Sequence, residues 1–141
     1  MTPGLIILLV VVVLVLALGG WRLSTDGRFR AGRTPPADAP PSLLAGTPWQ
    51  DQLGERATLL QFSSAFCAPC RATRRTLGEV AAIVPGVVHV EVDAELHLDL
   101  VRQLKVMRTP TTLVLDAAGH EVTRAAGAPS KDQVIAALAQ S

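Results

Sequence analysis

The two cysteines of the chain lie three residues apart, in the segment Phe66-Cys67-Ala68-Pro69-Cys70-Arg71. The apolar stretch from Ala57 to Ser63 precedes them and predicts a buried strand, while the residues from Cys67 to about Val84 are typical of a helix. A Cys-x-x-Cys pair between a strand and a helix is typical of a redox site. The pattern therefore predicts that the two thiols form and break a disulfide.

The predicted position of Cys67 at a helix N-terminus gives the pair its chemistry. Unpaired amide groups and the positive end of the helix dipole favour a thiolate there. That thiolate can attack a substrate disulfide, and Cys70, about one turn further on, can resolve the mixed disulfide. Pro69 limits the conformations of the pair and fits a first helical turn, where its missing N–H donor is not needed. Arg71 adds positive charge nearby.

Three other readings of the cysteine pair are weaker. A zinc half-site needs two more ligands, but the chain has no further cysteine and its three histidines show no paired-ligand spacing. Haem attachment needs a histidine directly after the second cysteine, where Arg71 stands. A purely structural disulfide over so short a loop contributes little by loop closure. We therefore expect no metal and no cofactor beyond the redox-active Cys67–Cys70 disulfide itself.

The elements that must position the cysteines alternate along the chain. Residues 87–93 predict a strand, 95–105 a helix, and 111–115 and 121–125 a hairpin with Gly119 in its turn. The last helix is predicted to start at Ser130, with Gln133 completing a capping box. The order β-α-β-α-β-β-α indicates the α/β class, with a central mixed sheet and helices on both faces.

The segment around the cysteines resembles the thioredoxin superfamily. The active-site motif of thioredoxins, Trp-Cys-Gly-Pro-Cys-Lys, is similar to the stretch from Phe66 to Arg71. Thioredoxins also carry a cis-proline before a central strand, and Thr109-Pro110-Thr111 resembles that element, 43 residues after Cys67. Gly119 and Gly127 match family glycines, and the resemblance covers roughly residues 43 to 140. It implies a thioredoxin-like fold.

The resemblance also implies roles for individual residues. Cys67 would be the exposed, attacking thiolate and Cys70 the buried, resolving thiol. A cis Pro110 would bring the backbone of Thr109 against the cysteines to pair with a substrate strand. Phe66, Ala68, Pro69 and Arg71 would support substrate binding around them. The simpler reading of Pro110 is a proline at the entry of a strand.

Two positions depart from the family pattern and affect proton transfer. Thioredoxins place a buried aspartate six residues before the first cysteine, where this chain has Gln61. An amide can form hydrogen bonds but cannot accept and return a proton at neutral pH. His89 aligns roughly with a family lysine in the same area. Gln61 and His89 are therefore candidates for a proton relay. The alternative interpretation is that His89 faces solvent or has its hydrogen bonds satisfied without a role in the reaction. Phe66 keeps an apolar rim but lacks the indole donor of tryptophan.

The apolar residues, 49% of the chain, are concentrated at its N-terminus. The uncharged stretch Pro3 to Trp21 would span about 28 Å as a helix, close to the hydrocarbon thickness of a bilayer. Trp21 followed by Arg22 is typical of an interfacial anchor. A cleaved signal peptide would have a basic residue before its apolar core, and none is present. We expect residues 1–21 to be an uncleaved anchor that contacts the membrane through residues 3–21.

The remaining sequence predicts a linker and one domain. Residues 22–42 are first basic and then proline-rich, which favours an extended spacer, and residues 43–141 form the thioredoxin-like domain. Four arginines follow the apolar stretch, so the positive-inside rule predicts a single-pass plasma-membrane protein with a cytoplasmic domain. An extracytoplasmic domain is the alternative.

The functional prediction is a membrane-tethered thiol–disulfide oxidoreductase of the protein-disulfide reductase type. Its partners would be protein disulfides and an electron-donating thiol reductase or membrane redox partner. The near-neutral net charge of +1 and the small number of aromatic residues argue against nucleic acid. Two alternatives stay open: an extracytoplasmic thioredoxin that reduces apocytochromes or exported proteins, and a non-catalytic thioredoxin-fold module for binding or metal handling.

Overall fold

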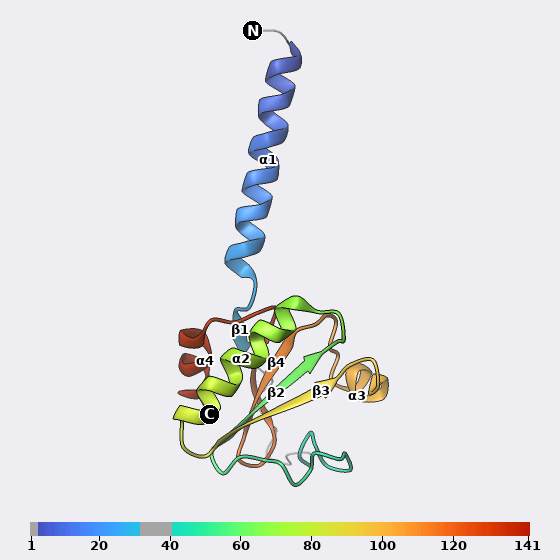
Figure 1. Ribbon diagram of the computed structural model, residues 1–141, viewed down its shortest axis with the longest axis vertical. Helices are drawn as coiled ribbons and strands as arrows, with labels where there is room; N and C mark the ends of the chain where they lie inside the picture. Colours follow the sequence, from blue (N-terminus) through green and yellow to red (C-terminus); the bar gives the residue numbers. More distant parts are fainter. Residues whose placement is uncertain (1–2, 32–40) are drawn as a thin grey trace.

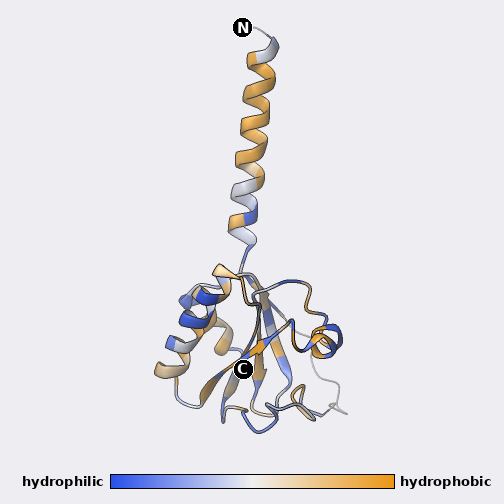
Figure 2. Cartoon of the chain, turned by 45° about the vertical axis from the view of Figure 1, so that its right-hand side comes forward, coloured by the Kyte–Doolittle hydropathy of each residue, from blue (hydrophilic) through white to orange (hydrophobic). Residues whose placement is uncertain are grey.

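The computed structural model describes residues 3–31 and 41–141. Its first helix, α1 (Pro3–Thr25), stands apart from the rest of the described chain (Figure 1) and has no buried residue. Apolar residues fill most of its length (Figure 2), with a mean hydropathy of 2.9 over its most apolar window. At 1.5 Å per residue its 23 residues reach about 34 Å. Length and composition suit a membrane span, and a signal sequence near the N-terminus would have the same features.

The domain is built on a five-stranded sheet in the order β1-β5-β4-β2-β3. Its strands are β1 (Phe29–Ala31), β2 (Ala57–Ser63), β3 (Val87–Asp93), β4 (Thr111–Asp116) and β5 (Glu121–Ala126). β2 and β3 are parallel, whereas β4 is antiparallel to β2 and to β5, and β5 is antiparallel to β1. The sheet is therefore mixed, as predicted.

Helices cover both faces of this sheet because successive residues of the central strands point to opposite sides. α2 (Ala68–Ile83) and α4 (Lys131–Leu138) pack on one face, over a core that includes Leu59 of β2. α3 (Leu98–Gln103) lies over the other face, where Leu60 and Phe62 point (Figure 1). Every residue of β2 is buried. Together these features confirm the predicted thioredoxin-like fold.

The local signals for the last helix and the central strands also agree with the structure. Ser130 caps α4: its Oγ accepts from the amide of Gln133, and the Gln133 side chain accepts from the amide of Ser130, so the predicted capping box is present. β2 and β3 begin and end at the predicted residues. Both patterns depend on neighbouring residues only.

The predicted helix over residues 95–105 is wrong in its extent, because α3 comprises only residues 98–103. Asp93 Oδ1 accepts a hydrogen bond of 2.8 Å from the amide of Glu95, and this turn delays the start of the helix. Lys105 has a φ of 52°, a left-handed conformation that ends it.

The division into residues 1–21, 22–42 and 43–141 stays a prediction, but the structure corrects the linker within it. α1 continues through residues 22–25, and Phe29–Ala31 form a strand of the sheet instead of a spacer. Phe29 is half-buried and packs against the core under α2 and α4. The predicted proline-rich part lies mainly outside the described residues.

Candidate active site

Cys67 and Cys70 form a disulfide with a Cα–Cα distance of 5.2 Å at the start of α2. Cys67 is the N-cap of the helix, and its Sγ accepts a hydrogen bond of 3.1 Å from the amide of Cys70. Pro69 lies in the first turn, as its sequence position predicts. Cys67 is half-buried, whereas Cys70 is only 2% exposed. The accessible sulfur therefore belongs to the residue at the helix N-terminus.

The loop before β4 lies beside the strand that leads to the cysteines. The Thr109–Pro110 peptide bond is cis. Thr111 pairs with Phe62 near the end of β2, and the hydroxyl groups of Thr109 and Ser64 are 3.1 Å apart. The structure thus brings Thr109 and Pro110 to the end of the sheet from which the cysteine segment leaves.

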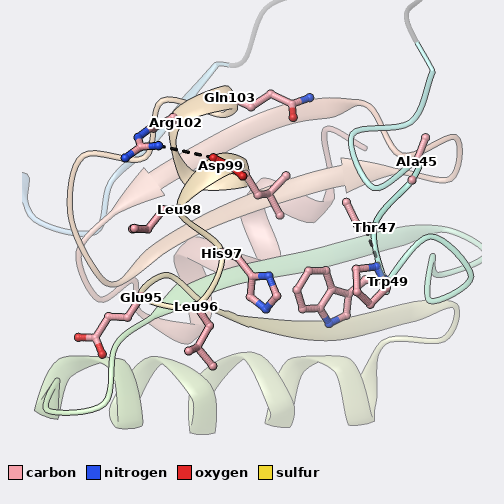
Figure 3. A pocket seen from close by; sticks show the side chains of 13 residues that line it. Ala45, Thr47, Trp49, Glu95, Leu96, His97, Leu98, Asp99, Arg102 and Gln103 are labelled. Carbon is pink, nitrogen blue, oxygen red and sulfur yellow. Dashed lines mark hydrogen bonds and ion pairs between the residues drawn. The ribbon is translucent and has the colours of Figure 1, made fainter.

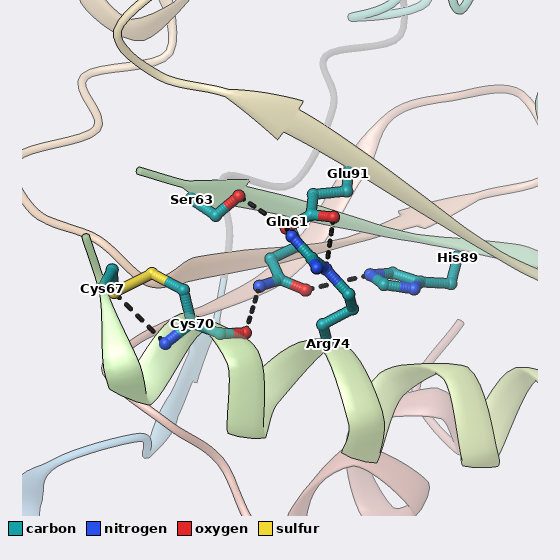
Figure 4. A network of polar contacts seen from close by, with 7 residues as sticks. All are labelled: Gln61, Ser63, Cys67, Cys70, Arg74, His89 and Glu91. Atoms are coloured by element: carbon teal, nitrogen blue, oxygen red, sulfur yellow. Dashed lines mark hydrogen bonds and ion pairs between the residues drawn. A yellow bond between two sulfur atoms is a disulfide. The ribbon is translucent and has the colours of Figure 1, made fainter. Parts of the chain in front are cut away.

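The side chain of Gln61 bridges α2 and β3 (Figure 4). Its Nε2 donates a hydrogen bond of 3.0 Å to the carbonyl oxygen of Cys70, and its Oε1 lies 3.0 Å from Nε2 of His89. Gln61 is fully buried. Burial lowers the pKa of His89, with a smaller opposing effect of Glu91, so the neutral ring donates from Nε2 to the amide oxygen. Gln61 and His89 are in contact, as a relay would require. Gln61, however, contacts the main-chain carbonyl of Cys70 and not its sulfur.

A second polar group beside the cysteines centres on Glu91 of β3 (Figure 4). Its carboxylate accepts a hydrogen bond of 2.6 Å from Ser63 Oγ and one of 2.7 Å from Arg74 Nη2, and Arg74 Nε forms an ion pair of 2.6 Å with its other oxygen. Partial burial would raise the pKa of Glu91, but the hydrogen bonds from Arg74 and Ser63 and the charge of Arg74 outweigh it and lower the pKa. This carboxylate is therefore ionised at neutral pH.

Glu91 and Arg74 share a cavity of about 360 Å³ with both cysteines and Arg71. The cavity gives water and charged groups a route to the disulfide. Sequence reasoning missed Ser63, Ser64 and Glu91. One signal could have found Glu91: β3 alternates, so His89 and Glu91 point to the same face, toward α2.

The residues next to the disulfide in the chain, and the loop before Pro110, carry exposed side chains. Phe66, directly before Cys67, is 99% exposed, and Met107, in the loop before Pro110, is 91% exposed. Ala68, Pro69 and Arg71 are also exposed. Sequence reasoning named all of these except Met107, which carried no motif.

A larger cavity of about 550 Å³ lies elsewhere, between α3 and the turns before β2 (Figure 3). The ring of Trp49 meets the ring of His97 edge-on there, with 4.7 Å between the ring centroids. Neither cysteine lines it. Among residues 3–31 and 41–141, no three His, Cys, Asp or Glu residues are grouped so that they could hold a metal ion.

A strand-to-helix disulfide, a cis-proline loop beside it and this sheet order define a thiol–disulfide oxidoreductase of thioredoxin-like architecture. Comparison with known proteins agrees. The Thioredoxin family model matches residues 42–140, which is most of the chain. The chain belongs to the thioredoxin family.

Relatives and solved structures support that assignment. The chain is 32% identical over 85 residues to the thioredoxin of Chlamydia trachomatis, covering 60% of this chain and 82% of the relative. It is 27% identical over 100 residues to thioredoxin H4-1 of Oryza sativa, covering 66% and 76%. The X-ray structure of Fasciola hepatica thioredoxin aligns with a TM-score of 0.56 at 22% identity, covering 64% of this chain and 86% of that one.

Proposed function

We propose that this thiol–disulfide oxidoreductase is tethered to a membrane by α1 and reduces disulfides in proteins. The observation that carries the reductase proposal is the asymmetry of the pair: Cys67 is accessible at a helix N-terminus and Cys70 is buried behind it. Exposed Phe66 beside Cys67 supports a protein substrate, because an apolar rim can contact a polypeptide.

In the reduced enzyme the Cys67 thiolate attacks one sulfur of a substrate disulfide. A mixed disulfide forms, and the other substrate sulfur leaves as a thiolate that takes up a proton. Cys70 then loses its proton and attacks Cys67 Sγ, which releases the second substrate thiol and restores the disulfide of this chain. Two electrons pass to the substrate. A dithiol donor must return them, and we propose a thiol reductase or a membrane redox partner for this step.

Gln61 and His89 act in this proposal by holding the first turn of α2. The hydrogen bond to the Cys70 carbonyl fixes the backbone of the resolving cysteine against β2. Neither Gln61 contact reaches a sulfur, so water in the cavity beside Glu91 is the proposed acceptor of the Cys70 proton.

The test uses the full chain in proteoliposomes with a disulfide-bonded protein substrate and dithiothreitol as electron donor. Cys67→Ser should abolish catalysed reduction. Cys70→Ser, reduced beforehand and freed of reductant, should accumulate a mixed disulfide with the substrate, and dithiothreitol added afterwards should reverse it. Catalysed reduction by Cys67→Ser at the wild-type rate would refute the proposed chemistry.

Membrane attachment and sidedness need separate measurements. We propose a single-pass plasma-membrane protein with its domain in the cytoplasm, because the arginines follow the apolar helix. The chain should resist extraction of membranes with alkaline carbonate. Labelling of reduced Cys67 in intact cells by a membrane-impermeant maleimide would refute the cytoplasmic placement and favour the extracytoplasmic alternative.

A further inference from the structure

The segment that follows α1 is part of the folded domain. β1 pairs with β5 in the register Phe29 to Ala125 and Ala31 to Thr123. The Thr123 hydroxyl donates a hydrogen bond of 2.7 Å to the carbonyl oxygen of Arg30. Only residues 26–28 separate the end of α1 from this strand. Little chain is therefore available for the domain to move away from the helix.

Those connecting residues are themselves fixed. The amide of Gly27 donates a hydrogen bond of 2.9 Å to the carbonyl oxygen of Ala126, and Asp26 forms an ion pair with Arg108. Gly27 has a φ of +73°, and a Cβ there would overlap the carbonyl of Ala128. A Cβ on Gly127 would overlap the carboxylate of Asp26. Residues 26–27 and 127–128 are therefore packed so closely that a side chain on either glycine would overlap with the other segment.

The same contacts join this segment to the cis-proline loop. Arg108, the partner of Asp26, donates a hydrogen bond of 2.8 Å to the carbonyl oxygen of Ala126. The amide of Gly127 donates one of 2.8 Å to the carbonyl oxygen of Pro110. The end of α1 is thus linked through residues 26, 108 and 127 to the loop beside the disulfide.

The register of the sheet then gives the orientation of the active site. The first residue of β1 pairs near the end of β5, Ala126 pairs with Thr111, and Thr111 pairs with Phe62 near the end of β2. The start of β1 and the end of β2 therefore lie at one end of the sheet, three strand spacings or about 14 Å apart. α1 leaves the domain at this end, where α2 also begins (Figure 1).

The surface at this end has the chemistry of a membrane-proximal contact. Phe66 and Met107 are apolar and almost fully exposed. Arg22, Arg28 and Arg71 are exposed cations around the same end. If Trp21 lies at the bilayer interface, residues 22–25 add only about 6 Å of helix before the domain begins.

We propose that residues 26–31 hold the domain with its cysteine end toward the bilayer, so that its preferred substrate is a disulfide held near the membrane surface by an integral membrane protein. This inference rests on the membrane tether and the reductase chemistry of the proposed function. The steps are those given above: Cys67 attacks the partner disulfide, Cys70 resolves, and the partner leaves with two thiols. The orientation adds a preference for substrate disulfides that lie close to the bilayer surface.

The test compares two membrane-inserted substrates. Each is a single-span peptide with one disulfide-closed loop, either directly at the bilayer surface or on a 30-residue helical spacer about 45 Å above it. Proteoliposomes contain the full chain, reduced beforehand and freed of reductant, and oxidation of Cys67 and Cys70 is followed in a single turnover. We expect the near loop to react at least about tenfold faster, because it shares the reach of the cysteines.

Two insertion variants test whether the docked segment is the cause. A 12-residue Gly/Ser insert between Thr25 and Asp26 adds a span of about 19 Å and leaves β1 free to pair. It should reduce the ratio of the near-loop rate to the far-loop rate, the near-to-far ratio, to about threefold or less. The same insert between residues 36 and 37, beyond β1 in the chain, is the matched control and should keep the full ratio. A soluble peptide with the same loop should react equally with all three proteins.

The outcomes separate the two proposals. Failure of every loop to react refutes the proposed reductase function. Reaction with equal rates for near and far loops overturns the orientation and leaves the function standing. An unchanged ratio in the Thr25–Asp26 insert variant overturns the role of residues 26–31. If that variant fails with the soluble loop, the near-to-far ratio of the unmodified chain decides the question.

Discussion

Gln61, which is fully buried, and His89, which is half-buried, form a pair whose energy can be measured by a double-mutant cycle. Gln61→Leu removes the hydrogen bond to the Cys70 carbonyl, which has a net value of about 1 kcal/mol. It also takes away the amide oxygen that faces His89 Nε2, which costs about 1–2 kcal/mol for a half-buried donor. We expect a total loss of about 2–3 kcal/mol in the free energy of unfolding.

His89→Leu should cost a similar amount, because it leaves the fully buried Gln61 oxygen without that donor. In the double variant both polar partners are replaced by apolar groups, so the second substitution should add little. The coupling free energy should therefore be close to the cost of one single substitution, about 2–3 kcal/mol. Urea unfolding of the disulfide form in detergent measures it, with Trp49 fluorescence in a Trp21→Phe background.

Turnover distinguishes a positioning role from a proton relay. General acid–base catalysis contributes typically about 10²–10⁴-fold, whereas the structure places the Gln61 amide on the main chain of Cys70. We expect His89→Leu to retain turnover within about threefold at pH 7, in line with a group that serves only to position. A loss of a hundredfold, or singles that cost less than about 0.5 kcal/mol, would refute this reasoning.

Three further predictions concern stability. Because burial lowers the pKa of His89, the folded chain binds fewer protons than the unfolded one as the pH falls. The contribution of His89 to stability should be full above about pH 6.5 and should decrease as the pH falls from there toward the folded pKa. His89→Gln should flatten this decrease, measured as urea midpoints between pH 7.5 and 5. Ser130→Ala should cost about 1 kcal/mol in urea unfolding, because the α4 cap is lost, with turnover unchanged. Gly27→Ala should detach β1 at a cost of about 2 kcal/mol, seen as faster hydrogen exchange at residues 29–31 while β4 stays protected.

Each of these results has a clear contrary outcome. Glu91 has a lowered pKa, so its contribution is lost only below about pH 4.3, and a slope between pH 7.5 and 5 that survives His89→Gln must come from another group. Unchanged midpoints in Ser130→Ala would mean that the capping box adds nothing to α4. Unchanged exchange at residues 29–31 in Gly27→Ala would show that the docked segment tolerates a side chain.

The elements around the cysteines could be predicted from the sequence because their signals are local. β2 is a continuous apolar run, and Ser130 with Gln133 is a capping pair within one turn. The extent of α3 could not be predicted, since Leu96, Leu100 and Leu104 have helical spacing over more residues than the helix occupies. The hydrogen bond from Glu95 to Asp93 competes with the helix there, and propensity alone does not rank the two.

The polar groups beside the disulfide depend on pairing between distant segments. Gln61 and Glu91 are 30 residues apart in the chain but directly opposite in the parallel pair β2–β3. Once the register is known, the alternation of β3 puts His89 and Glu91 on the side of α2. Sequence reasoning reached Gln61 and His89 through the family resemblance and did not reach Glu91, because none of the motifs that carry the resemblance includes position 91.

β1 shows most clearly where sequence reasoning stops. Phe29-Arg30-Ala31 is too short for a period-two pattern, and the arginines around it fit a juxtamembrane linker equally well. The family match also begins beyond it, at residue 42. Its place in the sheet comes from main-chain bonds to β5 and from the Asp26–Arg108 pair, which no local pattern encodes. Residues 26–31 therefore connect the apolar helix to the domain, and they also determine which end of the domain faces that helix. An extended linker over residues 22–42, as predicted from the sequence, would have let the cysteines face in any direction. A strand that pairs at the cysteine end of the sheet does not allow this, because it fixes that end toward α1.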